Sequence, residues 1–231
     1  MDVESLKAEQ ISLAKRVELR DKLRFEEIEF VAGVDQAFND FRGRETLVIS
    51  AAVLMSFPEL DVIDSKTVVD KVDFPYIPGF LMFREGKSAI RVLKELFGGD
   101  AKKAVVLVDG SGIAHPRRCG LASYIAIETG IPTIGITKHR LVGEYEEPKR
   151  AGEVRALLFE GERIGYVLKT CKRCNPIFIS PGSYITPELS LRVVKACLKG
   201  FKLPEPIRLA DKLAREKKRA LRDAELRDVY A

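Results

Sequence analysis

The chain lacks any apolar stretch long enough to cross a membrane. Among its 231 residues, no uninterrupted run reaches the roughly 18 apolar residues that a membrane-spanning helix requires. Its first residues, MDVESLKAEQ, are acidic and polar, whereas a secretory signal has a positively charged start followed by an apolar segment. From these two absences we expect a cytoplasmic protein without a membrane partner.

The chain is also poor in the residues that usually bind zinc. It has two histidines and four cysteines, of which only Cys171 and Cys174 show the C-x-x-C spacing. A structural zinc site generally uses two such pairs, so a zinc-stabilised interaction protein is disfavoured and remains an alternative for metal analysis to test. We interpret Cys171 and Cys174 first as free thiols or an incidental pair, and second as a local disulfide.

No internal repeat, low-complexity tract or linker divides the chain. Its length suits one large domain, and its 46% of hydrophobic residues suffice for a full core. Charged residues make up 32% and are mixed in sign, unlike those of a disordered chain. The net charge of +5 suits a polyanionic partner but is weak evidence alone. We therefore expect a monomer with a single domain over residues 1–231.

The first part of the chain predicts a helix followed by three strands. Apolar residues at helical spacing predict an amphipathic helix from residue 2 to about residue 22. The segments EFVAGVDQAF, TLVISAAVLM (46–55) and LDVIDSKTVVDKV (60–72) then have the apolar or loosely alternating patterns of strands. Their short connections are typical of an antiparallel meander.

After the irregular segment FPYIPG, helices and strands are expected to alternate. A helix that ends at Gly98-Gly99 precedes AVVLV (104–108), whose fully apolar sequence is typical of a buried parallel strand. Further expected elements are a helix between Pro116 and Gly130, strands at 131–137 and 163–170, a helix from Thr186-Pro187-Glu188 and a charged helix from Ile207 onward. This order predicts an α/β fold with a mixed sheet and helices on both faces.

Two acids lie within or directly after strongly apolar strands. Asp35 is near the middle of EFVAGVDQAF, and Asp109 follows AVVLV. Buried carboxylates are costly to desolvate, and two on neighbouring strands repel each other unless a cation lies between them or one is protonated. Oxygen ligands with few histidines favour Mg²⁺ or Mn²⁺ over zinc. The alternatives are a water-bonded strand acid at Asp35 and a turn residue at Asp109.

Several other residues have weaker patterns. Glu85 follows the segment FPYIPG (74–79), which we call the Pro-Gly loop, and Asp211 lies at the polar border of the last expected helix. Without further evidence, either residue would more often be a solvated acid on a helix. Gly110 and Gly112 would let a phosphate approach the backbone. His115 lies beside this loop, where a histidine is more often structural than catalytic.

Four strings in this order resemble the endonuclease V family of deoxyinosine-directed repair nucleases: GVDQAF, PYIPGFLMFRE, VDGSGIAHPRRCGLASYIAIETGIPTIGITKHRL and LPEPIRLAD. The resemblance extends from about residue 28 to residue 212. It implies a ribonuclease H-like fold, in agreement with the mixed sheet expected above. It also implies a DNA repair endonuclease that hydrolyses the second phosphodiester 3′ to deoxyinosine, leaving a 3′-hydroxyl and a 5′-phosphate.

The resemblance implies roles for the candidate residues. Asp35, Asp109 and Glu85 would act in catalysis and bind Mg²⁺, for which Mn²⁺ could substitute. Asp211 falls on a fourth metal position that is His or Asp in the family, and Lys138 falls on a basic position near the cut phosphate. The wedge that enters the duplex would be Tyr76 with Pro75, Ile77 and Pro78, and His115 matches the histidine of the family's AHPR string. We expect the backbone of the loops at Gly79 and Gly110–Gly112 to form the pocket for the modified base, because glycine allows close approach. Without the resemblance of PYIP to the family's wedge, we would interpret Tyr76 as an ordinary loop tyrosine.

The chain departs from the family in two places. The late loop, often SPGHR, here contains Ser183-Tyr184 and loses its basic pair, and the CKRC segment is not a familiar family feature. The C-terminal stretch KLAREKKRALRDAELRDVYA acquires no role from the resemblance. Alternatives on the same fold are an inosine-directed endoribonuclease and a junction resolvase. A non-catalytic nucleic-acid-binding module is disfavoured because all the acids are present.

Overall fold

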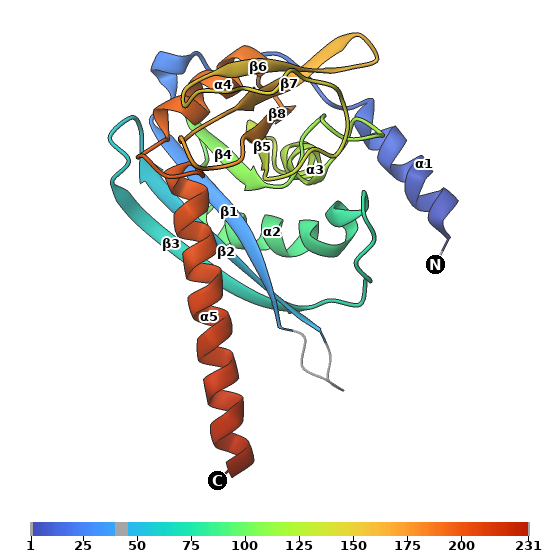
Figure 1. Cartoon of the computed structure of the whole chain (residues 1–231). Helices are drawn as coiled ribbons and strands as arrows, with labels where there is room; N and C mark the ends of the chain where they lie inside the picture. The colour runs from blue at the N-terminus through green and yellow to red at the C-terminus, as the bar shows by residue number, and fades with distance from the viewer. Residues whose placement is uncertain (1, 40–45, 231) are drawn as a thin grey trace.

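A computed structural model describes residues 2–39 and 46–230 of the chain, with an eight-stranded sheet at its centre (Figure 1). The strands are β1 (Phe30–Asn39), β2 (Leu47–Ser56), β3 (Val62–Lys71), β4 (Ala104–Asp109), β5 (Thr133–Thr137), β6 (Val154–Phe159), β7 (Glu162–Leu168) and β8 (Ile177–Ser183). The helices are α1 (Val3–Ala14), α2 (Leu81–Phe97), α3 (Leu121–Thr129), α4 (Pro187–Ala196) and α5 (Glu205–Tyr230), with a 3-10 turn at Phe25–Glu27.

The sheet is mixed, as predicted, with the strand order β3-β2-β1-β4-β5-β8-β7-β6. β1, β2 and β3 form the expected antiparallel meander, whereas β4 is parallel to both of its neighbours, β1 and β5. β8 runs antiparallel to β5 and continues the sheet through β7 to β6. β4 is buried from Ala104 to Val108, which explains its uninterrupted apolar sequence.

Helices cover both faces of the sheet, which confirms the α/β prediction. On one face α2 and α3 pack on residues of the central strands that include Val34 and Val108. On the other face α4 and α5 pack on residues that include Val31 and Leu107. Because side chains alternate along a strand, the central strands supply an apolar layer to each face.

Gly33 allows α5 to lie directly on β1. A Cβ added at this position would overlap the backbone of Pro206 and Ile207 at the start of the helix. Only glycine leaves room for such a close backbone approach. The contact brings Asp211, in the second turn of α5, within electrostatic reach of Asp35 on β1.

The N-terminal helix is shorter than predicted, since α1 ends at Ala14 rather than near residue 22. The following segment bonds instead to the end of β8. The Tyr184 N–H donates to the Glu18 carbonyl at 2.7 Å, and the Glu18 N–H donates to Ser183 Oγ at 2.8 Å. The Lys22 N–H donates to the Tyr184 carbonyl at 3.0 Å. These long-range bonds compete with helix continuation, and Ser183-Tyr184 anchors the N-terminal segment.

Other element predictions were partly wrong. β6 and β8 were not predicted, and the segment around Pro181-Gly182 was described as a loop through the resemblance to the family, whereas it belongs to β8. Pro181 lies next to an irregularity in the β5–β8 pairing, where a strand tolerates proline. α3 begins at Leu121 rather than near Pro116, which lies in a turn. The predicted start of α4 is confirmed, because Thr186 Oγ1 accepts a hydrogen bond from the Leu189 N–H at 3.2 Å.

Cys171 and Cys174 form a disulfide within the loop that connects β7 to β8. The first interpretation of this pair as free thiols was therefore wrong, and the second, a local disulfide, is confirmed. Cys119 and Cys197 are buried free thiols. In the described ranges no helix is long and apolar enough to cross a membrane.

Candidate active site

Asp35 and Asp109 are neighbours on parallel strands. β1 and β4 pair with Val34 opposite Val108, so the next residue on each strand is an acid. Asp35 is 7% exposed, and its carboxylate accepts a hydrogen bond from the Gln36 N–H at 2.7 Å. Burial raises the pKa of Asp35 to about 8, and repulsion from Asp109 adds to this shift. The sheet register therefore brings together the two acids that the sequence singled out.

Glu85 joins this pair from the opposite face of the sheet. It lies in the second turn of α2, shortly after the Pro-Gly loop, and is 7% exposed. Burial raises the pKa of Glu85 to about 8, with further contributions from Asp35 and Asp109. No ion pair within the described residues involves Glu85 or Asp35, and their raised pKa values favour the protonated carboxyl groups in the absence of a bound cation.

Two cations hold the remaining acids of the cluster. Lys138, directly after β5, donates from Nζ to Oδ2 of Asp109 at 2.5 Å. Burial lowers the pKa of Lys138, but the attraction of Asp109 outweighs this and raises it overall. On α5, Arg215 donates to both carboxylate oxygens of Asp211, with an Nε–Oδ1 distance of 2.8 Å. Asp211 also raises the pKa of Asp35, which shows that α5 adds its charge to the cluster.

The chemistry of the four acids fits a hard divalent cation. No three His, Cys, Asp or Glu groups of the described chain converge on one point as they stand. Lys138 and Arg215 pair with Asp109 and Asp211, whereas neither Asp35 nor Glu85 forms an ion pair with any described residue. A divalent cation would compensate these two buried carboxylates, and carboxylate oxygens are the donors that Mg²⁺ and Mn²⁺ prefer.

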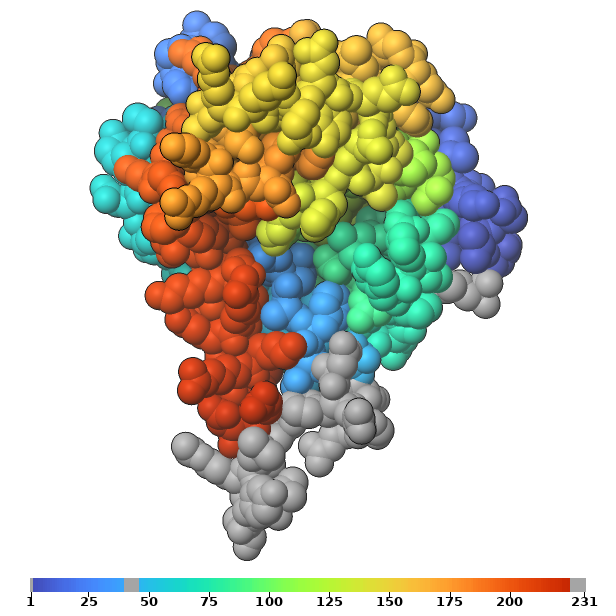
Figure 2. Space-filling model, in the orientation of Figure 1, coloured from blue at the N-terminus to red at the C-terminus, as the bar shows by residue number. Residues whose placement is uncertain are grey.

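The surface above β1 is hollowed between α5 and the region of α2. In Figure 2 residues of β1 are visible at the bottom of this hollow, with α5 forming one wall. The Asp109 side chain is 19% exposed, so the acid cluster is accessible from solvent. A nucleic-acid strand lying in the hollow could therefore reach the acids.

A small pocket lies beside the acid cluster. Its volume is about 240 Å³, below the roughly 300–1,000 Å³ of sites for drug-sized ligands. The Pro-Gly loop, the loop after β4 and the segment after β5 line it, with Tyr76, Ile77, Pro78, Gly79, Gly110 and His115 among the lining residues. Asp109 borders the pocket as well, so a group bound there would lie next to the acids. Gly112 is not among the lining residues and packs instead against the backbone of Pro181.

A partly buried hydrogen-bond network holds the end of the Pro-Gly loop. Nε2 of His115 and Nη2 of Arg117 both donate to the Gly79 carbonyl, at 3.0 and 2.6 Å. The Arg117 N–H donates to Nδ1 of His115 at 3.1 Å, so the imidazole proton is on Nε2. Burial and repulsion from Arg117 lower the pKa of His115 to about 4, which keeps the ring neutral. In this structure His115 binds the loop.

Gln10 of α1 supports the same network and was not predicted from the sequence. It is 1% exposed, accepts a hydrogen bond from Nε of Arg117 at 2.6 Å and donates to the Cys119 carbonyl at 2.6 Å. The available signal was a polar side chain on the apolar face of the predicted helix, between Leu6 and Leu13.

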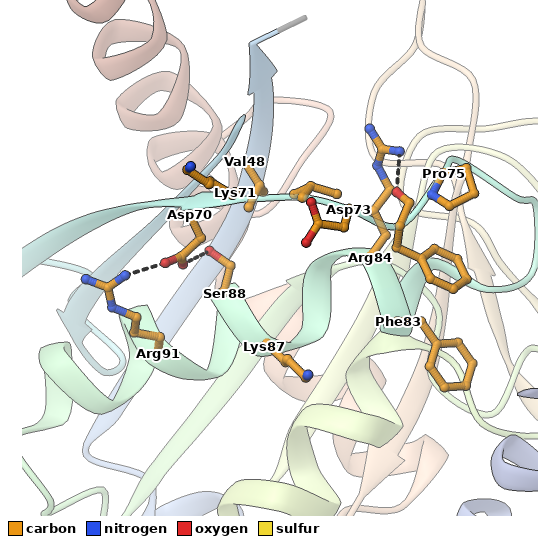
Figure 3. Close-up of a pocket in the computed structure, with 12 residues that line it drawn as sticks. Val48, Asp70, Lys71, Asp73, Pro75, Phe83, Arg84, Lys87, Ser88 and Arg91 are labelled. Carbon is orange, nitrogen blue, oxygen red and sulfur yellow. Dashed lines mark hydrogen bonds and ion pairs between the residues drawn. The ribbon is translucent and has the colours of Figure 1, made fainter. Parts of the chain in front are cut away.

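Arg84 holds the other end of the loop (Figure 3). Its Nη1 donates to the Phe74 carbonyl at 2.9 Å, and its guanidinium lies 4.3 Å from the ring centroid of Phe38. The groove in this view, about 680 Å³ in volume, also contains the Asp70 carboxylate, which Ser88 and Arg91 bind. The loop between Phe74 and Gly79 is thus fixed at both ends, whereas Tyr76 between them is 68% exposed.

Comparison with known proteins identifies the family. The sequence profile of endonuclease V matches residues 11–212. Endonuclease V of Archaeoglobus fulgidus is 53% identical over 221 residues, which cover 96% of each protein. The chain belongs to the endonuclease V family. Family members are metal-dependent nucleases, so the chain is an enzyme that hydrolyses phosphodiester bonds.

Solved endonuclease V structures agree with this fold. The enzyme from Streptomyces avermitilis is 34% identical, with a TM-score of 0.83 and coverage of 97% of this chain and 95% of that one. The Ciona intestinalis enzyme is 25% identical, with a TM-score of 0.81 and coverage of 95% and 98%; it was crystallised with DNA containing an inosine followed by a ribo-adenosine. The ribonuclease H-like fold predicted for this chain is thereby confirmed.

Proposed function

We propose that this endonuclease V recognises deoxyinosine in DNA and hydrolyses the second phosphodiester on its 3′ side. The cut would leave a 3′-hydroxyl and a 5′-phosphate. The observation that carries the proposal is the base-sized pocket beside the Asp35–Asp109 pair, because it joins a recognition site to a candidate hydrolytic site.

Asp35, Asp109, Glu85 and Asp211 would hold the divalent metal, which we propose to be Mg²⁺ with Mn²⁺ able to replace it. The bound metal would supply positive charge for the phosphoryl oxygens and promote deprotonation of a water. Binding would ionise Asp35 and Glu85, whose pKa values are raised by burial and by repulsion between the acids. Lys138, already beside Asp109, would add positive charge near the scissile phosphate.

The pocket would receive the extruded hypoxanthine. Gly79 and Gly110 contribute backbone rather than side chains to its lining, which favours close contact with a flat base. Hypoxanthine lacks the exocyclic amine of guanine, and a pocket of about 240 Å³ can exclude that amine by size. The loop residues Pro75–Pro78 would act as the wedge, with the exposed Tyr76 stacking in the gap left by the base.

A second candidate substrate is inosine-containing RNA. The Ciona enzyme was crystallised with a strand in which a ribonucleotide follows the inosine, which favours testing RNA directly. Matched DNA and RNA strands with one inosine, each with and without Mg²⁺, distinguish the two substrates. Faster cleavage of the RNA strand would replace deoxyinosine DNA with inosine RNA as the substrate, whereas no cleavage of either would overturn the proposed function.

A further inference from the structure

The second half of α5 is not needed to fill the core. The helix packs on the sheet through Ile207, Ala210 and Ala214, which are at most 1% exposed. Toward its C-terminus the helix projects past the sheet (Figure 1), and the side chains of residues 215–224 are exposed or half-buried. A helix of 26 residues is about 39 Å long. A projecting helix of this length calls for an explanation other than burial of apolar surface.

This projecting part is rich in cations. Residues 215–224 have a net charge of +3, whereas the whole chain has +5. The cations are Arg215, Lys217, Lys218, Arg219 and Arg222, and the acids are Glu216 and Asp223. Like charges close together on a helix destabilise it by a few tenths of a kcal/mol per pair, so folding alone does not favour this cluster.

Some of these cations continue the helix face that carries Asp211. At about 100° per residue, Asp211, Arg215, Lys218 and Arg222 lie within about 60° of arc, and Arg219 lies about 40° further round. Arg215 is bound to Asp211, and Arg219 is 3.9 Å from Asp223. Neither Lys218 nor Arg222 has an ion pair with any residue that the structure describes. We call Lys218, Arg219 and Arg222 the basic stripe.

The basic stripe leads away from the candidate active site. Arg222 is 11 residues beyond Asp211, about 16 Å along the helix, which matches roughly five nucleotides of a DNA strand. α5 also forms one wall of the hollow above β1 (Figure 2). A duplex whose scissile phosphate reached the acids would therefore extend alongside this helix.

We propose that the basic stripe binds the phosphate backbone of the nucleic acid several nucleotides away from the cut. This inference rests on the proposed function, because it assumes a duplex bound at the acid cluster. Contacts with phosphates carry little sequence information, so the stripe should strengthen binding without selecting the lesion. It would lower the KM while leaving kcat unchanged.

The test compares two double variants that each remove two positive charges. Lys218→Gln with Arg222→Gln changes the stripe. The control, Lys217→Gln with Lys102→Gln, changes another face of α5 and an exposed residue before β4, at the end of that strand opposite Asp109. The affinity of each protein for inosine-containing and undamaged duplexes is measured over a range of KCl concentrations, and kcat and KM are measured with Mg²⁺. Thermal unfolding should be similar for all proteins, since the replaced side chains are exposed or half-buried.

The stripe variant should lower the slope of log affinity against log salt by about 1.8, because each phosphate contact contributes about 0.9. It should weaken both duplexes to the same extent and raise KM without changing kcat, while the control keeps the wild-type slope. Equal effects of the two variants, or no effect of either, would overturn the proposal that the basic stripe binds the phosphate backbone. If instead the wild type does not distinguish the two duplexes, the proposed function fails, and the contrast between the variants still decides whether the stripe binds nucleic acid.

Discussion

Replacing Asp35 with asparagine should stabilise the metal-free protein while destroying its activity. The Asp35 carboxyl is 7% exposed and has no cation partner in the described chain. Folding in the absence of metal therefore requires this group to take up a proton at neutral pH. Asparagine has a similar shape and needs no proton, so the substitution removes this cost.

The magnitude follows from the change in pKa. Burial and repulsion from Asp109 raise the pKa of Asp35 from 3.8 to about 8. The folded state then binds more protons than the unfolded state between these values, so stability decreases as pH rises through this window and levels off above about 8. At pH 7 the cost is about 4 kcal/mol relative to a pH below both values, since each pKa unit corresponds to about 1.4 kcal/mol.

The assay is urea unfolding near pH 7 in EDTA and again with Mg²⁺. In EDTA, Asp35→Asn should be more stable than the wild type, by up to about 4 kcal/mol at pH 7. Its stability should also fall less steeply between about pH 4 and pH 8, because the proton uptake of Asp35 is lost and Glu85 retains a raised pKa. Mg²⁺ should stabilise the wild type much more than the variant.

A matched control is Asp64→Asn on β3. Asp64 has a half-exposed side chain, and its hydrogen bond to Lys66 lowers its pKa, so asparagine there should leave stability nearly unchanged near neutral pH. If Asp35→Asn proved less stable than the wild type in EDTA, the view of Asp35 as an uncompensated buried acid would be refuted.

Three further substitutions test other parts of the site. Tyr76→Ala should leave thermal stability nearly unchanged, because the side chain is 68% exposed. It should weaken binding to an inosine duplex by about 1–3 kcal/mol, the usual range for the loss of base stacking. Unchanged affinity would show that Tyr76 is not part of the wedge. Gln10→Leu should destabilise the protein by about 1–3 kcal/mol in urea unfolding, because Nε of Arg117 and the Cys119 carbonyl lose their partner. It should also raise the KM for the inosine duplex more than Leu13→Ala on the same helix does. Equal KM values for the two variants would mean that Gln10 only packs α1 against the protein. Lys138→Gln should reduce kcat by roughly 10²-fold in single-turnover cleavage, since it removes a positive charge beside Asp109, and a wild-type kcat would exclude Lys138 from the chemistry.

The predictable features of the fold were those with a strong local pattern. The run Ala104–Val108 is apolar throughout and proved to be a buried parallel strand, and the Thr186-Pro187 helix start was correct to the residue. The candidate acids were recognisable because a carboxylate in an apolar strand conflicts with its surroundings. That Asp35 and Asp109 are adjacent, however, depends on the β1–β4 register, which local patterns do not determine.

The features that were missed depend on contacts between distant segments. The helix was extended past Ala14 because nothing local shows that Glu18 bonds to Ser183 and Tyr184. The end of β8 was described as a loop through the resemblance to the family, and no local pattern shows that Pro181 lies beside an irregularity in the pairing with β5. Gln10 escaped notice because its partners, Arg117 and Cys119, lie more than 100 residues away in sequence.

The most direct test of the central claim is cleavage of a labelled duplex with one deoxyinosine, with and without Mg²⁺, by the wild type and by Asp35→Asn. We expect the wild type to cut the second phosphodiester 3′ to the lesion only when Mg²⁺ is present, and the variant not to cut, although it still binds the duplex. Cleavage by the variant at the wild-type rate, or equal cutting of an undamaged duplex, would contradict the account of Asp35 and Asp109 as the metal-binding centre of an inosine-directed nuclease.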